Sequence, residues 1–99
     1  MEVQFADKML DRMESDPDET GGFSAPIVKA FRKCMQAIRA APDERVFYAM
    51  KSLHFEKLKG RRQHQQSMRL NDQQRLILQL EGKAAEKVVV IVAIETHYE

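Results

Sequence analysis

The residues best suited to chemistry lie in a basic segment between Lys51 and Arg75 and in the C-terminal tail. This segment holds seven lysines and arginines against two acidic residues, whereas the formal net charge of the whole 99-residue chain is +1. A basic segment in a nearly neutral protein indicates local binding of an anionic partner. Charge alone nevertheless favours a simpler interpretation, a solvated loop rich in lysine and arginine.

The side-chain types in this set suit RNA among the anionic partners. Lysine and arginine neutralise phosphates, and histidine and tyrosine can stack on bases or transfer protons. RNA also carries its own nucleophile, the 2′-hydroxyl group, so strand cleavage needs no metal ion. A basic sheet face is more often a solvated or protein-binding surface, and composition favours these alternatives. The candidate residues are Lys59, Arg61, Arg62, Arg69, Arg75, His97 and Tyr98.

Metal and cofactor sites have little support in the sequence. His54, His64 and His97 show no four-residue spacing with a carboxylate partner, and Cys34 is the single cysteine. Glycine-rich nucleotide-binding motifs and the nucleophile motif of α/β-hydrolases are absent from the sequence. We therefore expect neither a metal ion nor a cofactor. Cys34 lies in the apolar stripe of a predicted helix, which indicates a small buried hydrophobic residue rather than a reactive thiol.

Two predicted strands would position the arginines. Apolar and polar residues alternate over 65–71, which places Met68 toward the core and Arg69 on the opposite face. In the next strand, over 75–81, the leucines face the core and Arg75 faces away. Because a short polar turn joins the two strands, Arg69 and Arg75 should share one face of a hairpin.

Helices and further strands would support this hairpin. Asp7 is expected to cap a helix that ends near Ser15, and Ser24 to cap a longer one that ends at Ala41, before a proline. A short strand at 3–5 precedes them, and another helical turn or two follows at 43–50. The β-branched run Val88–Ile94 is expected to form a central strand, buried on both faces and covered by the helices.

Together these elements predict an α+β fold with the order β-α-α-β-β-β. Two helices would pack on one face of a mainly antiparallel sheet. The length fits a single domain over residues 1–99. Because no apolar run reaches the roughly 20 residues that span a bilayer, we expect no membrane association. A single cysteine and the lack of a secretion signal fit a cytoplasmic protein.

Several short motifs occur together in the order and spacing of a known family. They are Leu58-Lys59-Gly60, then Ser67-Met68-Arg69-Leu70-Asn71 followed by Arg75, and finally Thr96-His97-Tyr98. The region from Ser52 to Tyr98 resembles the RelE/ParE superfamily of bacterial toxins. Within it the chain is most similar to the HigB branch, the plasmid maintenance system killer toxins. The helical first half fits the element order of that family, so the resemblance implies a RelE-like fold.

The resemblance implies a toxin of a type II toxin–antitoxin system. HigB-like toxins are ribosome-dependent, metal-independent endoribonucleases that cleave mRNA, and a small HigA-like helix-turn-helix antitoxin holds them inactive. Operator DNA is then bound only through the toxin–antitoxin complex. By motif position, Lys59, Arg69 and Arg75 would bind phosphate and stabilise transition-state charge. His97 and Tyr98 would act as acid/base or base-stacking groups.

Further RNA contacts are expected beside these residues, from His54, Lys57, Arg61, Arg62 and His64. The sequence also departs from the family pattern in two places. Gln74 stands where relatives usually have an aromatic residue, and the usual ending Asp-Tyr-His is replaced by Thr96-His97-Tyr98. Two alternatives therefore stay open: a ParE-type inhibitor of DNA gyrase on the same fold, or a catalytically weak relative that only binds the antitoxin.

Overall fold

The structure is a computed structural model that describes residues 1–83 and 86–96. It has the α+β architecture expected from the sequence. The elements, in chain order, are β1 (Glu2–Phe5), α1 (Lys8–Ser15), α2 (Ala25–Ala40), α3 (Arg45–Ala49), η1 (Lys51–Leu53), β2 (Glu56–Lys57), η2 (Gly60–Arg62), β3 (Gln65–Arg69), β4 (Gln74–Glu81) and β5 (Val88–Thr96), where η denotes a 3-10 helix.

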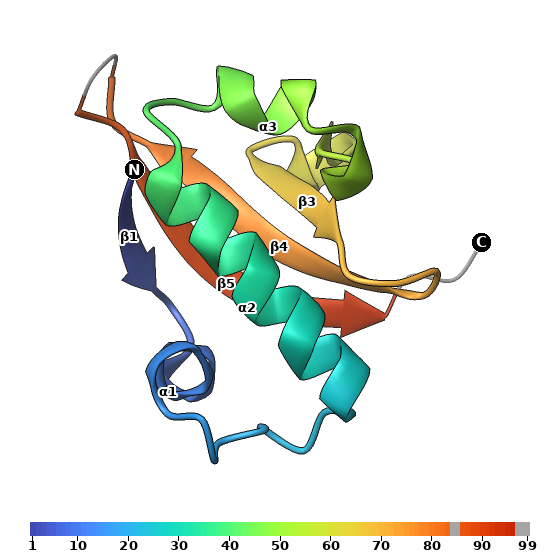
Figure 1. The fold of residues 1–99 in the computed structure, drawn as a ribbon. Coiled ribbons are helices and arrows are strands. Elements are labelled where there is room, and N and C mark those ends of the chain that lie inside the picture. The colour runs from blue at the N-terminus through green and yellow to red at the C-terminus, as the bar shows by residue number, and fades with distance from the viewer. Residues whose placement is uncertain (84–85, 97–99) are drawn as a thin grey trace.

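The strands form one sheet in the order β1-β5-β4-β3-β2. β1 pairs with β5 in parallel, and all other pairs are antiparallel. The long helix α2 crosses one face of this sheet, with α1 and α3 beside it (Figure 1). The predicted order is therefore confirmed, with one addition. The two-residue strand β2 was not predicted, because it is too short to show any alternation of apolar and polar residues.

The helices begin and end where their capping residues predict. Asp7 caps α1, and its side chain accepts a hydrogen bond of 2.8 Å from the backbone N–H of Met9. Ser24 occupies the N-cap position of α2, although its side chain makes no capping hydrogen bond. The last residue of α2 is Ala40, and Ala41 is its C-cap in an extended conformation, because the following Pro42 pushes Ala41 out of the helical region.

The core lies between α2 and the sheet. The apolar stripe of α2 supplies Phe31, Met35 and Ile38, each 0–1% exposed, and α3 supplies the fully buried Phe47. The sheet supplies a second set of fully buried side chains, Met68, Leu76, Leu78, Val89 and Ile91. These residues alternate along β3, β4 and β5, as expected for strands that bury one face.

Cys34 is part of this core, as the sequence indicates. It is 4% exposed, and burial raises the pKa of its thiol to about 11 from the ordinary value of 9.0. Between these two pH values the unfolded chain loses the thiol proton while the folded chain keeps it. The free energy of unfolding should therefore fall as the pH rises from about 9 to about 11.

The burial of Cys34 leads to a chemical prediction. At pH 8 the native protein should react with iodoacetamide far more slowly than the chain unfolded in guanidinium, because only the accessible thiolate reacts. Mass spectrometry of the adduct over time measures both rates. Equal rates for the folded and unfolded protein would show that Cys34 is accessible in the native state.

The face of the sheet opposite α2 carries no α-helix among the described residues. We call it the open face; it presents Gln65, Ser67, Arg69, Arg75, Ile77, Gln79, Val88, Val90 and Glu95. The prediction that the valine run of β5 is buried on both faces is wrong. Val89 and Ile91 are buried, but Val88 and Val90 are only half-buried. β-branched residues favour strands whether or not both faces are covered, so the run could not decide this.

A β-bulge interrupts the pairing of β4 with β5. Ile77 is paired with Ala93, but the next residue of β4, Leu78, is paired with Ile91. Val92 is therefore an extra residue on β5, and such a residue locally reverses the alternation of side chains between the two faces.

The bulge determines which face the end of β5 presents. Ile91 points toward the helices, and strict alternation would put Glu95 on that same side. Because of the extra residue, Ile94 instead packs against the core, and Glu95 is paired across strands with Arg75 on the open face.

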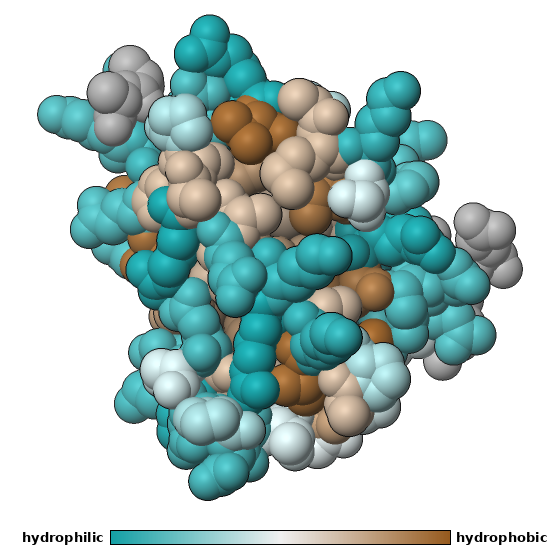
Figure 2. Space-filling view, in the orientation of Figure 1, coloured by the Kyte–Doolittle hydropathy of each residue, from teal (hydrophilic) through white to brown (hydrophobic). Residues whose placement is uncertain are grey.

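The outer surface of the helical layer is mostly hydrophilic. Figure 2 shows polar side chains over much of this face, with hydrophobic ones gathered near α3 and near the beginning of α2. Tyr48 and Met50 are the exposed large hydrophobic residues there, at 61% and 37%. The Tyr48 ring packs edge-on against Phe55, with ring centroids 4.8 Å apart. Within the described ranges 1–83 and 86–96, no helix is long and apolar enough to cross a bilayer.

Candidate functional site

Arg69 and Arg75 lie directly opposite each other across the hairpin of β3 and β4. This confirms their predicted shared face. Two like charges at opposed positions of a sheet repel each other, which raises the cost of this arrangement. Asp72, in the turn between the strands, forms an ion pair with the Arg69 guanidinium and offsets part of that repulsion.

Arg75, on the other strand of the hairpin, is half-buried. Its Nη1 atom is shielded from solvent and has no hydrogen-bond partner among the described residues. Its cross-strand neighbour Glu95 directs its carboxylate to a different arginine, Arg62. The Nη1 atom itself is not reached from solvent, but the rest of this half-buried guanidinium lies on the sheet face, where it can bind an anionic group.

Arg62 is bound on all three of its guanidinium nitrogens. Nη1 and Nη2 donate to the two carboxylate oxygens of Glu95 at 2.8 and 2.7 Å, and Nε donates to Oε1 of Gln65 at 2.9 Å. Gln65 in turn donates to Gln79 at 2.8 Å. The hydrogen bonds to Glu95 raise the pKa of Arg62.

The Arg62 contacts explain an unexpected feature of the open face. Gln65 is on β3 and Glu95 is on β5, so the guanidinium that contacts both must cross β4. On β4, Gln65 is paired with Gln79 and Glu95 is paired with Arg75. Ile77 lies midway between these two partners, so the Arg62 side chain crosses β4 over Ile77. Ile77 is 3% exposed and its neighbour Ser67 is 1% exposed, although no described α-helix covers them.

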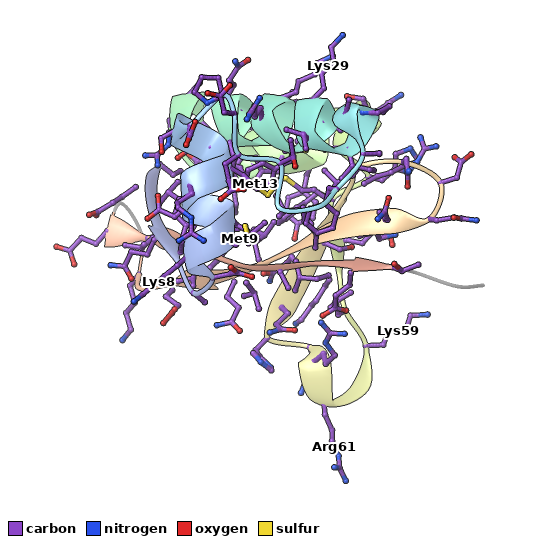
Figure 3. The ribbon with its side chains drawn as sticks, turned by 90° about the horizontal axis from the view of Figure 1, so that it is seen from below. Lys8, Met9, Met13, Lys29, Lys59 and Arg61 are labelled. Atoms are coloured by element: carbon purple, nitrogen blue, oxygen red, sulfur yellow. The ribbon has the colours of Figure 1, made fainter. Side chains whose placement is uncertain are left out.

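Lys59 and Arg61 have the opposite orientation to Arg62. Both are exposed, and in Figure 3 the segment that carries them lies on the side of the sheet away from α2, with both side chains pointing outward. Lys59 precedes η2, and Gly60 begins it with a φ of +67°, a conformation that glycine adopts without strain. Neighbouring residues in one 3-10 turn thus serve different purposes, since Arg61 faces solvent and Arg62 faces the sheet.

The remaining residues expected to bind RNA are spread along the same edge. His54, Lys57 and His64 are all exposed. His54 has a φ of +46°, in the left-handed region that non-glycine residues rarely adopt. Lys57 is paired with Gln66, whose other cross-strand neighbour is the core residue Leu78, so Lys57 belongs to the helix side of β2.

Glu95 is the residue of this site that the sequence pattern missed. It was assigned no role, because its position on the open face depends on the bulge at Val92. The charge of Glu95 could have indicated a role, because it is an acidic residue at the end of an apolar strand and close to the expected site. His97 and Tyr98, predicted as acid/base groups, lie outside the described residues.

Two pockets lie away from the exposed basic residues of η2. The larger, of about 580 Å³, is on the outer side of α2 and is lined by Thr20, Val28, Arg32 and neighbouring residues. Arg32 there donates to the carbonyl oxygen of Met13 at 2.9 Å and to two further carbonyls, so it fixes the loop after α1. A smaller pocket of about 250 Å³ includes Arg69 and lies beside Cys34. Neither pocket includes Arg75.

The described part of the chain contains no cluster of side chains that could bind a metal ion. Over residues 1–83 and 86–96, no group of three or more histidine, cysteine, aspartate or glutamate side chains could hold an ion.

The sequence matches one family model over almost its full length. Residues 3–97 match the model of the RelE-like toxin of the type II toxin–antitoxin system HigB. The chain belongs to the HigB-like toxin family. This HigB-like toxin is therefore the toxin component of a type II toxin–antitoxin system, a role that implies an antitoxin partner.

A solved structure has the same fold as this HigB-like toxin. It is the YoeB/ParE toxin from Agrobacterium tumefaciens, with a TM-score of 0.60 and 17% sequence identity. The match covers 99% of this chain and 100% of that one. At this level of identity the likeness supports the RelE-like fold only. No curated protein matches the HigB-like toxin sequence.

Proposed function

We propose that this HigB-like toxin is an endoribonuclease that cleaves mRNA on the ribosome in the bacterial cytoplasm. The position of Arg75 on the sheet is the observation that carries the proposal. Arg75 is half-buried on the open face, its Nη1 atom has no partner among the described residues, and it lies opposite Arg69. Two guanidinium groups on adjacent strands, together with the exposed Lys59, can neutralise the reacting phosphate, and the exposed Arg61 can hold the flanking backbone.

The proposed reaction uses the 2′-hydroxyl group of the RNA. A base removes the 2′-proton, the 2′-oxygen attacks the adjacent phosphorus, and the bond from phosphorus to the 5′-oxygen breaks. An acid protonates the 5′-oxygen as it leaves, so the products are a 2′,3′-cyclic phosphate and a 5′-hydroxyl end. Arg69, Arg75 and Lys59 stabilise the negative charge of the pentacoordinate phosphorane. His97 and Tyr98 remain our candidates for the base and the acid.

The antitoxin is proposed to be a HigA-like helix-turn-helix protein encoded beside the toxin. Its binding would hold the toxin inactive, and the complex of the two would bind operator DNA. Co-expression of the neighbouring small gene should restore growth to cells that express the toxin. Operator binding by the complex but not by the free toxin would be measured by electrophoretic mobility shift.

The test of the activity is cleavage of ribosome-bound message. Expression of the toxin should arrest growth, and primer extension should find new 5′ ends in translated mRNA. If growth stops with filamentation and DNA damage while the message stays intact, the chain is a gyrase inhibitor instead. If growth does not stop at all, the chain is an antitoxin-binding relative without toxicity.

Arg61→Ala should weaken RNA binding without changing the chemistry. Arg61 is exposed and points away from the sheet, so it can contact a phosphate but not the reacting atoms (Figure 3). The slope of log affinity against log salt should decrease by about 1, and cleavage at saturating RNA should keep its rate. Filter binding across a salt series measures the slope. An unchanged slope would place the RNA away from η2.

A further inference from the structure

We infer that Arg62 and Glu95 are a positioning pair that holds the η2 loop, residues 58–64, over the open face. The inference rests on the proposed function for its substrate, RNA, but not for its structural basis. Arg62 was expected to bind RNA by its charge. Its three guanidinium nitrogens instead contact Glu95 and Gln65.

At the base of the loop, Leu58 donates its backbone N–H to the carbonyl oxygen of Gln65 on β3 at 2.9 Å, and few other contacts fix the rest of the loop. The strand β2 that leads into it is two residues long and lies at the edge of the sheet. Within the loop, Arg62 donates its backbone N–H to Lys59 at 3.4 Å, and Gln63 donates to Gly60 at 3.3 Å. These hydrogen bonds shape η2 but do not attach it to the sheet. The Arg62 side chain makes that attachment, across β4 to the end of β5.

The geometry of the pair requires an arginine and a carboxylate. A guanidinium presents parallel N–H groups that match both oxygens of a carboxylate and leaves Nε free for a third partner. Lysine has the same charge but cannot make these three directed contacts. Gln65 donates onward to Gln79, so the attachment extends over β3, β4 and β5. The pair is about half exposed, so its loss should leave the global fold intact.

Glu95 distinguishes this inference from a purely electrostatic explanation of the site. An acid beside Arg75 repels phosphate, so an electrostatic surface for RNA would improve if the acid were removed. If Glu95 positions the loop that carries Lys59 and Arg61, its removal lowers activity although the site becomes more positive. The two explanations therefore predict changes of opposite sign for the same substitution.

The experiment compares Glu95→Gln and Arg62→Lys with the control Glu81→Gln. Glu81 is an exposed acid at the far end of β4 on the same face, so it matches the change of charge without touching the loop. We expect Glu95→Gln and Arg62→Lys each to lower kcat on ribosome-bound message by about 10- to 100-fold, as misplaced catalytic groups do. The KM should change much less, and the double variant should be no slower than the slower single one.

Hydrogen exchange gives a readout that does not depend on the reaction. The amides of Arg62 and Gln63 should exchange faster in Glu95→Gln and Arg62→Lys than in the wild type or Glu81→Gln. Growth arrest should weaken in the same two variants. If the wild-type toxin cleaves no message, the proposed function fails, and exchange together with growth arrest still decides the positioning role. Tighter RNA binding with wild-type kcat and unchanged exchange in Glu95→Gln would overturn the inference.

Discussion

Arg75→Ala is expected to abolish growth arrest and to slow RNA cleavage by about 10²–10³-fold, the usual loss when one preorganised donor to a developing negative charge is removed. Arg75 projects onto the open face, and its Nη1 atom makes no hydrogen bond with the described residues. The substitution should therefore remove a group that acts on the substrate while it leaves the sheet intact. Cleavage of ribosome-bound message at saturating toxin measures the effect.

The control for Arg75→Ala is Arg45→Ala. Arg45 is an 88%-exposed arginine on α3 whose ion pair with Asp43 is local. The Arg45→Ala variant also loses one positive charge, but on an element outside the sheet. It should arrest growth like the wild type. Circular dichroism and thermal melting should show that both variants are folded. A folded Arg75→Ala variant that cleaves message at the wild-type rate would exclude Arg75 from the active site.

Phe31→Ala is expected to lower the free energy of unfolding by about 3–5 kcal/mol. Phe31 is fully buried in the middle of α2, where the helix crosses the sheet, and truncation leaves a cavity in the core in addition to the lost burial of the ring. A domain of this size has a total stability of about 5–15 kcal/mol, so the loss is a large share of it. Guanidinium denaturation followed by circular dichroism measures the shift of the midpoint.

Lys29→Ala is the matched control for Phe31→Ala. Lys29 is exposed on the same helix and points away from the core (Figure 3). Its replacement should change the free energy of unfolding by no more than about 0.5 kcal/mol, because surface substitutions rarely exceed this. If the two variants unfold at the same denaturant concentration, the packing of α2 on the sheet does not hold the fold together.

Much of the fold follows from local signals in the sequence. Asp7, Ser24 and Pro42 mark the ends of two helices, and strict alternation marks β3 and β4. The same alternation placed Arg69 and Arg75 on one face, because a tight hairpin keeps the register of its two strands. These features depend on residues close together in the chain, which is why the pattern predicted them.

The features that were missed depend on residues far apart in the chain. The contact between Arg62 and Glu95 joins positions 33 residues apart, and nothing near either residue indicates it. The half-burial of Val88 and Val90 depends on which face the helices cover. Sequence reasoning could gather the basic residues of the candidate site. It could not separate Arg61, which faces solvent, from Arg62, which is bound to the sheet.

The extra residue at Val92 gives the two ends of β5 different structural requirements. Before the bulge, Val89 and Ile91 must remain apolar, because they fill the core. Beyond the bulge, Glu95 lies on the open face because Val92 shifts the pairing of β5 by one residue. A one-residue insertion or deletion there would exchange the two faces of the strand end, so that Glu95 would turn toward the helices and Ile94 would leave the core. The bulge therefore couples the position of Glu95 on the open face to the packing of Ile94 in the core, and neither can be moved to the other face alone.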